Sequence, residues 1–203
     1  HLNGLMKPTS GRVLIDGRDI NAPGENTRKL RFQVGLVFQY PEHQLFEETV
    51  YKDIAFGPRN MGLSSEEIDG RVRSAMDMVG LPFEEIKERS PFEVSGGQMR
   101  RIALAGVLAM RPRVLVLDEP TAGLDPRARD LLLQDIERLH KEGTTVVMIS
   151  HAMDDVARLA TRIAVLEQGR LVMAGPPEIV FGRFEELTGM GLDVPQGCQL
   201  ARR

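Results

Sequence analysis

Four short runs of aliphatic residues stand out against the more polar remainder of the sequence. They are QVGLVF (33–38), RVLVL (113–117), TTVVMIS (144–150) and RIAVL (162–166). None of the four alternates apolar with polar residues, which is typical of strands that are buried on both faces of a parallel sheet. We therefore expect the four runs to be the strands of a central, mostly parallel sheet.

The segments between these runs have the hydrophobic spacing of helices. SSEEIDGRVRSAMDMVG (64–80) begins with a capping box at Ser64, and SGGQMRRIALAGVLAM (95–110) is apolar on nearly all sides, so we expect it to be buried. DPRARDLLLQDIERLHKEG (125–143) has a proline in its first turn and ends at Gly143. Strands that alternate with helices predict an α/β fold.

Two further segments, GRVLIDGRDI (11–20) and LEQGRLVMAG (166–175), are predicted to be short hairpins that turn at glycine. Residues from about 41 to 110 are predicted to form a helical subdomain. Residues from about 182 to 203 form a weakly patterned C-terminal extension, for which no structure is predicted. A length of 203 residues suits one domain, and we expect residues 1–203 to belong to it.

Composition narrows the range of function classes. The chain has 26 basic and 29 acidic residues and a net charge of -3, which gives no support to a surface for nucleic acid or anionic lipid. The apolar stretch IALAGVLAM (102–110) is far shorter than the roughly 18 residues that a membrane span needs. The single cysteine, Cys198, excludes an internal disulfide and fits a reducing cytosol.

Polar side chains follow three of the predicted strands at the point where each strand ends. Gln39 comes after the first run, Asp118 and Glu119 come after the second, and His151 comes after the third. Ligands of open parallel sheets bind outside the carboxyl ends of the strands. We therefore expect an amide, two carboxylates and an imidazole at one edge of the sheet.

The two carboxylates suit different chemical tasks. Asp118, at the end of a buried strand, can hold Mg²⁺, which prefers oxygen ligands. Glu119 points in another direction and can orient or deprotonate a water molecule. A simple polar turn would also explain this pair, and a helix cap would explain His151, so the shared edge is what favours a functional site.

The stretch EVSGGQMRR (93–101) places two glycines at the start of a predicted helix. Ser95 and Gln98 fit a capping box, which needs no ligand. Gly96 and Gly97 are poor helix formers that cost up to about 1 kcal/mol each relative to alanine in a helix interior. Their N–H groups are open to an anion, which the helix dipole also favours. The sequence therefore predicts an anion site at this helix tip.

Four motifs together resemble the family of ABC-type ATPases, and the resemblance covers essentially the whole chain. They are VSGGQMRR (94–101), VLVLDEP (114–120), AGLDP (122–126) and ISH (149–151). The resemblance implies a P-loop NTPase-like fold, with a mostly parallel sheet, helices on both of its faces and a helical signature subdomain. It also implies hydrolysis of ATP with Mg²⁺ as cofactor.

The resemblance assigns a role to each candidate residue. The signature motif, which presses on the γ-phosphate of ATP held by a partner subunit, would consist of Ser95, Gly96, Gly97 and Gln98. The residues with other implied roles are Asp118 at the Mg²⁺ site, Glu119 as catalytic carboxylate, His151 as switch histidine, Asp125 in the loop that joins the two subunits, and Gln39 as a metal-site residue that senses nucleotide.

A narrower resemblance comes from FQYPEHQLFEETVYKDIAFGPRNMG (38–62), which is similar to the ATPase subunits of energy-coupling-factor transporters. These transporters import vitamins or transition metals such as cobalt or nickel. The variant QLFEETV (44–50) resembles the second member of the unequal ATPase pair. The resemblance implies a heterodimer, with a homodimer as the alternative, at the cytoplasmic face of the membrane.

In that family a cytoplasmic helix of the transmembrane coupling protein docks on the segment that corresponds to residues 39–56. Apolar side chains in this segment would line the groove for such a helix, although packing within the helical subdomain explains them equally well. They are Tyr40, Leu45, Phe46, Tyr51 and Phe56.

The sequence departs from the family in one respect, because it contains no Gly-Lys dipeptide and hence no G-x-x-x-x-G-K-[ST] loop. GLMKPTSG (4–11) does not match, since its lysine does not follow a glycine. We expect this loop and its strand to precede His1, and the natural chain to continue past Arg203. Without the loop, we expect the chain alone to bind ATP poorly and to be inactive.

Two rival functions remain open at this point. One is a soluble ABC-type ATPase that works on DNA or ribosomes, which the acidic balance and residues 38–62 disfavour. The other is a non-catalytic module that lends only its signature helix to a partner. Since an ATPase subunit does not contact the transported solute, vitamin and metal ion stay equally open.

Overall fold

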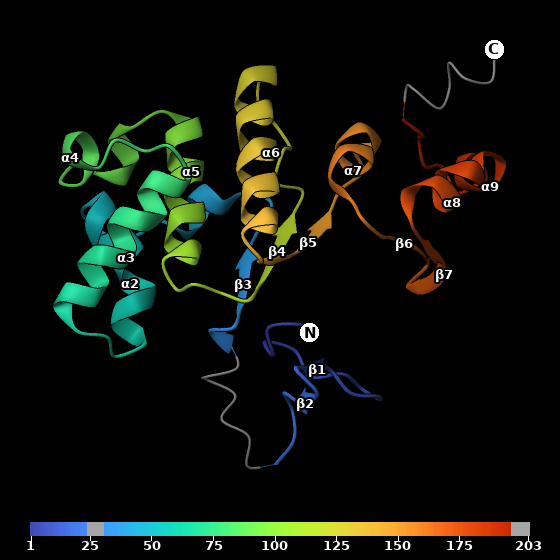
Figure 1. Ribbon diagram of the computed structural model, residues 1–203, viewed down its shortest axis with the longest axis horizontal. Helices are drawn as coiled ribbons and strands as arrows, with labels where there is room; N and C mark the ends of the chain where they lie inside the picture. Colours follow the sequence, from blue (N-terminus) through green and yellow to red (C-terminus); the bar gives the residue numbers. More distant parts are fainter. Residues whose placement is uncertain (24–30, 196–203) are drawn as a thin grey trace. The chain divides into compact units, whose positions relative to one another are not determined.

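The computed structural model describes residues 1–23 and 31–195, and the chain divides into two compact units (Figure 1). The first unit extends from His1 to Met148 and the second begins at Ile149. The prediction of one domain over residues 1–203 stays a prediction. Residues 196–203 of the predicted C-terminal extension, including Cys198, lie outside the described residues.

The first unit contains strands and helices in alternation after a short hairpin. Its strands are β1 (Leu14–Ile15), β2 (Arg18–Asp19), β3 (Val34–Val37), β4 (Val114–Asp118) and β5 (Thr145–Ile149), which reaches the boundary of the unit. Its helices are the 3-10 helices η1 (Pro41–Gln44) and η2 (Pro91–Glu93), and the α-helices α2 (Val50–Asn60), α3 (Ser65–Met78), α4 (Phe83–Ile86), α5 (Gly96–Leu108) and α6 (Pro126–Lys141).

Strands β3, β4 and β5 form a three-stranded sheet in that order (Figure 1). β3 and β4 are parallel, with Val37 opposite Leu117, and both are largely buried, as predicted. β5 instead exposes Val147 and Ile149. The expectation that this run is buried on both faces is therefore wrong, because the face of β5 that carries Thr145, Val147 and Ile149 is exposed in the described part of the chain.

Helix α5 packs against β3 and against helices α2 and α3. An ideal Cβ on Gly35 of β3 would lie 2.4 Å from Cγ1 of Val107 on α5, so the Val107 side chain occupies the space that a larger residue at position 35 would need. Each large side chain in this core contributes about 1.5–3 kcal/mol through burial. The fully buried members include Val50, Ile54, Val72, Met76, Ile102 and Leu115.

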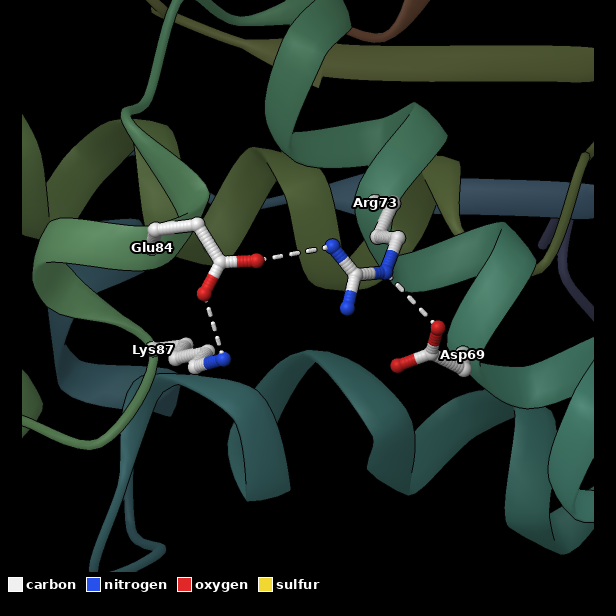
Figure 2. Close-up of polar contacts among 4 residues, drawn as sticks. All are labelled: Asp69, Arg73, Glu84 and Lys87. Carbon is white, nitrogen blue, oxygen red and sulfur yellow. Dashed lines mark hydrogen bonds and ion pairs between the residues drawn. The ribbon is translucent and has the colours of Figure 1, made fainter.

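The short helix α4 is held on α3 by charged side chains (Figure 2). Arg73 of α3 donates to Asp69 at 2.7 Å and to Glu84 of α4 at 3.0 Å, while Lys87 donates to Glu84 at 2.6 Å. The Arg73 guanidinium also lies 4.0 Å from the centre of the Phe83 ring. Hydrogen bonds from Lys87 and Arg73 lower the pKa of the Glu84 carboxyl below its ordinary value.

The second unit consists of α7 (Met153–Leu159), a hairpin of β6 (Ile163–Glu167) and β7 (Arg170–Gly175), α8 (Pro177–Gly182) and α9 (Phe184–Gly189). β6 was expected to be a strand of the parallel sheet, but its strand partner in the described residues is β7, and the pair is antiparallel. The turn has positive φ at Gln168 and Gly169, as in a type I′ hairpin. The buried core of this unit is formed by Val165, Met173, Val180, Phe181, Leu187 and Val194.

Candidate functional site at the carboxyl edge of the sheet

Asp118 is the last residue of β4, and Glu119 follows it immediately. Both residues are half-buried. Glu119 has a φ of 47°, in the left-handed region that residues other than glycine seldom adopt. Its carbonyl accepts the N–H of Ala122 at 3.1 Å, which closes a turn. Such backbone strain costs about 1–3 kcal/mol and is concentrated at functional sites.

Gln39 lies at the same edge of the sheet as these two carboxylates. β3 and β4 are parallel, and the register pair Val37–Leu117 precedes Gln39 and Glu119 by two residues each. The structure therefore brings together the segments that carry Gln39, Asp118 and Glu119, as the sequence predicts. Their oxygen donors are of the kind that Mg²⁺ prefers.

The capping box at the start of α5 is confirmed. The N–H of Ser95 donates to Oε1 of Gln98 at 3.0 Å, and the N–H of Gln98 donates to Oγ of Ser95 at 3.3 Å. An ideal Cβ on Gly96 or Gly97 would meet no heavy atom within 4 Å, and neither residue has a positive φ. In the part of the chain that the structure describes, neither packing nor backbone conformation therefore requires a glycine at these positions.

Asp125 is the N-cap of α6. Its Oδ1 accepts the N–H groups of Arg127 and Ala128, each at 3.0 Å. This cap explains the residue without a ligand. A place at the junction of two subunits is compatible with it and stays a prediction.

His151 follows β5 by two residues and lies in the second unit, where its side chain is exposed. The next residue, Ala152, donates its N–H to Oγ of Ser150 at 3.0 Å, just before helix α7 begins. The role of His151 as a switch residue stays a prediction.

Arg100, for which the sequence motifs indicate no separate role, lies beside these segments. It is only 8% exposed, and its guanidinium donates to the carbonyl oxygens of Gln39, Pro120 and Ala122. The sequence held one signal for it, since Arg100 precedes the apolar part of a helix that was predicted to be buried. Its partners, 20 to 61 residues away along the chain, were not predictable from that signal.

The five apolar side chains that were predicted to line a docking groove fall into two groups. Leu45 is buried, and the Tyr51 ring packs on Phe83 with ring centroids 6.2 Å apart. Packing among the helices between residues 41 and 110 therefore explains both residues. Phe46 and Phe56 are exposed and meet edge to face, with centroids 4.8 Å apart. Tyr40 is also exposed.

A pocket of about 350 Å³ lies at the other end of the sheet strands, where Gln33 precedes β3 and Arg113 precedes β4. Ile15, Asp16 and Arg18 of the first hairpin complete its lining. Asp16 and Arg113 form an ion pair there. This pocket is therefore distinct from the edge that carries the predicted site residues.

Two properties of the described residues concern metal ions and membranes. Among residues 1–23 and 31–195, His, Cys, Asp and Glu side chains nowhere gather in groups of three that suit a metal ion. A Mg²⁺ site with one or two protein ligands, which is usual where phosphates and water supply the others, does not need such a group. Within the same ranges no helix has the length and apolar character to cross a membrane.

Comparison with known proteins identifies the family. The family model described as "ABC transporter" matches residues 1–122. The chain is 54% identical to "Energy-coupling factor transporter ATP-binding protein EcfA2" of Clostridium tetani over 203 residues, which are 100% of this chain and 70% of that protein. It is 50% identical to the protein of the same name from Bacillus subtilis over 205 aligned positions, which span 100% of this chain and 74% of the relative.

A solved structure supports the same assignment. The structure of cbiO1 from Clostridium perfringens, described as part of the ABC transporter complex cbiONQ, aligns with a TM-score of 0.81. The two chains are 38% identical, and the alignment covers 100% of this chain and 80% of the other. The predicted α/β fold of P-loop NTPases is thereby confirmed. By its sequence and its fold, the chain belongs to the ABC transporter family and is an ATPase of that family.

Proposed function

We propose that this chain is the ATP-binding subunit of an energy-coupling-factor importer, in which ATP hydrolysis drives the uptake of a vitamin or a transition-metal ion. Membership of the ABC transporter family supports the ATPase activity. The importer class comes from relatives that are named as energy-coupling factor subunits and are 50–54% identical.

The observation that carries this proposal is the open tip of α5. The main-chain N–H groups of Gly96 and Gly97 lie at the positive end of a 13-residue helix, and among the described residues an added Cβ at either glycine would meet no heavy atom within 4 Å. The Ser95 hydroxyl accepts a hydrogen bond and keeps its own O–H available as a donor. These donors suit the terminal phosphate of a nucleotide. In the proposed dimer, a second ATPase subunit holds that nucleotide.

At the sheet edge, Glu119 is the group that acts on water. A carboxylate in hydrogen-bond reach of a water molecule can orient it and take its proton as it attacks the γ-phosphate. Asp118 and the amide oxygen of Gln39 are the residues that would hold Mg²⁺. Bound there, Mg²⁺ would offset the negative charge of the phosphates. We assign His151 to the γ-phosphate and Asp125 to the contact between subunits.

We place the membrane partner on the exposed aromatic residues Tyr40, Phe46 and Phe56. An amphipathic cytoplasmic helix can bury its apolar face against exposed apolar side chains of this kind. Because the segment begins directly after Gln39, a change near the nucleotide reaches the docking surface within a few residues. In this proposal the subunit is a peripheral protein at the cytoplasmic face of the membrane. A different ATPase subunit is the proposed dimer partner, with a second copy of this chain as the alternative.

Alanine at the two glycines tests the proposal, because stability and activity are expected to change in opposite directions. Open space around Gly97 leaves room for a methyl group, so Gly97→Ala should fold and should not lower the melting temperature. In the assembled transporter, the same methyl group would lie between the helix tip and the phosphate. We expect ATP hydrolysis to fall at least about tenfold, since a single lost donor to developing charge costs roughly 10²–10³.

Gly70→Ala is the matched control. Gly70 also lies in a helix, α3, and an ideal Cβ there meets no heavy atom within 4 Å. Alanine should stabilise this helix interior by up to about 1 kcal/mol and leave hydrolysis unchanged. Full activity of both Gly96→Ala and Gly97→Ala would rule out a phosphate at this helix tip.

A further inference from the structure

Arg100 is a buried cation whose partners are almost all main-chain carbonyl groups. Arg100 is only 8% exposed, and its guanidinium, like that of every arginine, is always charged in proteins. A buried charge is tolerated only where hydrogen bonds or an ion pair compensate for its lost hydration. The geometry of this residue therefore depends strongly on the groups that surround it.

The guanidinium reaches two separate segments at the sheet edge. Its Nη1 donates to the carbonyl oxygen of Pro120 at 3.2 Å and to that of Ala122 at 2.8 Å. Its Nη2 donates to the carbonyl oxygen of Gln39 at 3.4 Å. The Arg100 side chain thus connects helix α5 to the segments that follow β3 and β4.

One carboxylate accompanies this buried cation. Oε2 of Glu42 lies 3.7 Å from Nε of Arg100, which is an ion pair but too long for a hydrogen bond. That oxygen is buried and has no hydrogen-bond partner in the described part of the chain. Removal of Arg100 alone would leave this carboxylate without its counter-charge.

The two shortest hydrogen bonds of Arg100 are made to the turn that begins at Glu119. Pro120 is the next residue after Glu119, and Ala122 closes the turn through its N–H bond to the Glu119 carbonyl. Glu119 itself is in a left-handed conformation, with a φ of 47°. Such a conformation persists only where the surrounding structure holds it. The Arg100 side chain binds two of the carbonyl groups on the C-terminal side of this strained residue.

We propose that Arg100 is a positioning residue for hydrolysis, which holds the Glu119 turn in its strained conformation and so aims the carboxylate at the attacking water. This inference rests on the proposed role of Glu119 as catalytic carboxylate. Arg100 itself does not contact nucleotide in this account. Because Arg100 lies on helix α5, its hydrogen bonds also make the position of Glu119 depend on the position of α5.

The test is a double-mutant cycle between Arg100 and Glu119 in the assembled transporter, with ATP turnover as the readout. Arg100→Met should lower kcat by about 10–10²-fold with little change in KM for ATP, since small misplacements of a reacting group have effects of this size. In the Glu119→Gln background, Arg100→Met should lower the residual rate no further. Two changes that act through one group are not additive.

Two further variants keep the test decisive if Arg100→Met folds poorly. The double variant Glu42→Gln with Arg100→Met removes both buried charges, which is often tolerated where the loss of one is not. Arg100→Lys keeps the charge, but its ammonium lacks the planar fork that reaches both segments. Both variants should show the lower kcat expected for Arg100→Met, when kcat is calculated per folded molecule.

Arg71→Met controls for a purely structural effect. Nη1 of Arg71 donates to the carbonyl oxygens of Ala109 and Met110 at the other end of α5, at 3.4 and 3.3 Å. This variant should lower thermal stability and leave kcat unchanged. A multiplicative loss of rate in the Glu119→Gln background, or an unchanged kcat in all Arg100 variants, would overturn the inference. If Glu119→Gln alone has full activity, the proposed catalytic role is the part that fails.

Discussion

The carboxylate of Asp53, on helix α2, accepts the main-chain N–H of Phe46 at 2.9 Å. The same oxygen accepts the N–H of Glu47, also at 2.9 Å, and the Asp53 residue is only 9% exposed. The Phe46 ring, in contrast, is exposed and rests edge-on against Phe56. A buried carboxylate therefore sets the backbone from which an exposed aromatic ring projects.

Loss of the Asp53 carboxylate should destabilise the fold. Asp53→Ala leaves two N–H groups of a part-buried loop without their acceptor, which costs about 1–3 kcal/mol for a buried donor. Chemical denaturation of the purified chain measures this change. Asp53→Asn keeps an oxygen at the same place and should recover much of the loss. Equal stability of wild type and Asp53→Ala would show that water replaces the carboxylate at no cost.

Truncation of Phe46 should separate docking from folding. The ring is 59% exposed, so Phe46→Ala should change the free energy of unfolding by less than about 1 kcal/mol. If this ring contacts a membrane partner, less of the transmembrane subunit should co-purify in detergent with the variant. Phe92→Ala is a suitable control, because Phe92 is 58% exposed and lies outside residues 39–56. Identical recovery with both variants would contradict docking at Phe46.

Neutralisation of the proposed catalytic carboxylate should stop turnover without loss of nucleotide binding. Glu119→Gln keeps the size of the side chain and the backbone position but removes the base. We expect ATP hydrolysis by the assembled transporter to fall by roughly 10²–10⁴, the usual contribution of a general base. Binding of ATP, measured by calorimetry on the same assembly, should persist. A rate within twofold of wild type would assign the water-activating role to another residue.

The sequence predicted the elements of the site well, because their signals are local. The strand before Asp118 appears as a buried aliphatic run, and the capping box at Ser95 depends on residues three positions apart. Parallel pairing of β3 and β4 then places Gln39 near Asp118 without further information. Local pattern and known sheet topology were sufficient for these residues.

Features that depend on tertiary contacts were not predictable in this way. Nothing in the sequence next to Glu119 indicates its positive φ, which the turn to Ala122 and the Arg100 contacts accompany. The exposure of Val147 depends on what lies beside β5, and a sequence run does not encode that. Leu45 and Phe46 are both apolar, yet only the structure distinguishes the buried one from the exposed one.

A methyl group at Gly35 should damage the core, unlike one at Gly97. The added Cβ would lie 2.4 Å from Cγ1 of Val107 and 3.0 Å from Cγ of Pro112, both on side chains with little freedom to move. Overpacking of this kind costs about 1–3 kcal/mol. Thermal unfolding of Gly35→Ala should therefore begin at a lower temperature than that of wild type. Gly35→Ala combined with Val107→Ala should recover part of the loss, since the smaller side chain makes room for the methyl group.

The contacts of Glu84 should make the stability of the folded protein depend on pH in the acidic range. Hydrogen bonds from Lys87 and Arg73 lower its pKa in the folded state, so the folded protein binds this proton less readily than the unfolded chain does. The stabilisation is then present above the unfolded pKa and is lost as the pH falls through the lower, folded pKa. Glu84→Gln should have a lower melting temperature than wild type at pH 7, and the difference should shrink as the pH falls below roughly 4, the ordinary pKa of a glutamate.

Glu85→Gln, on the same short helix α4, is the control for this pH series. Glu84 forms ion pairs with Arg73 and Lys87, whereas the described contacts include none for the Glu85 side chain. Its substitution should lower the melting temperature less than Glu84→Gln does at pH 7, because no ion pair is lost. A Glu84→Gln difference that persists undiminished at pH 3 would show that packing of the side chain, and not its charge, holds α4 on α3.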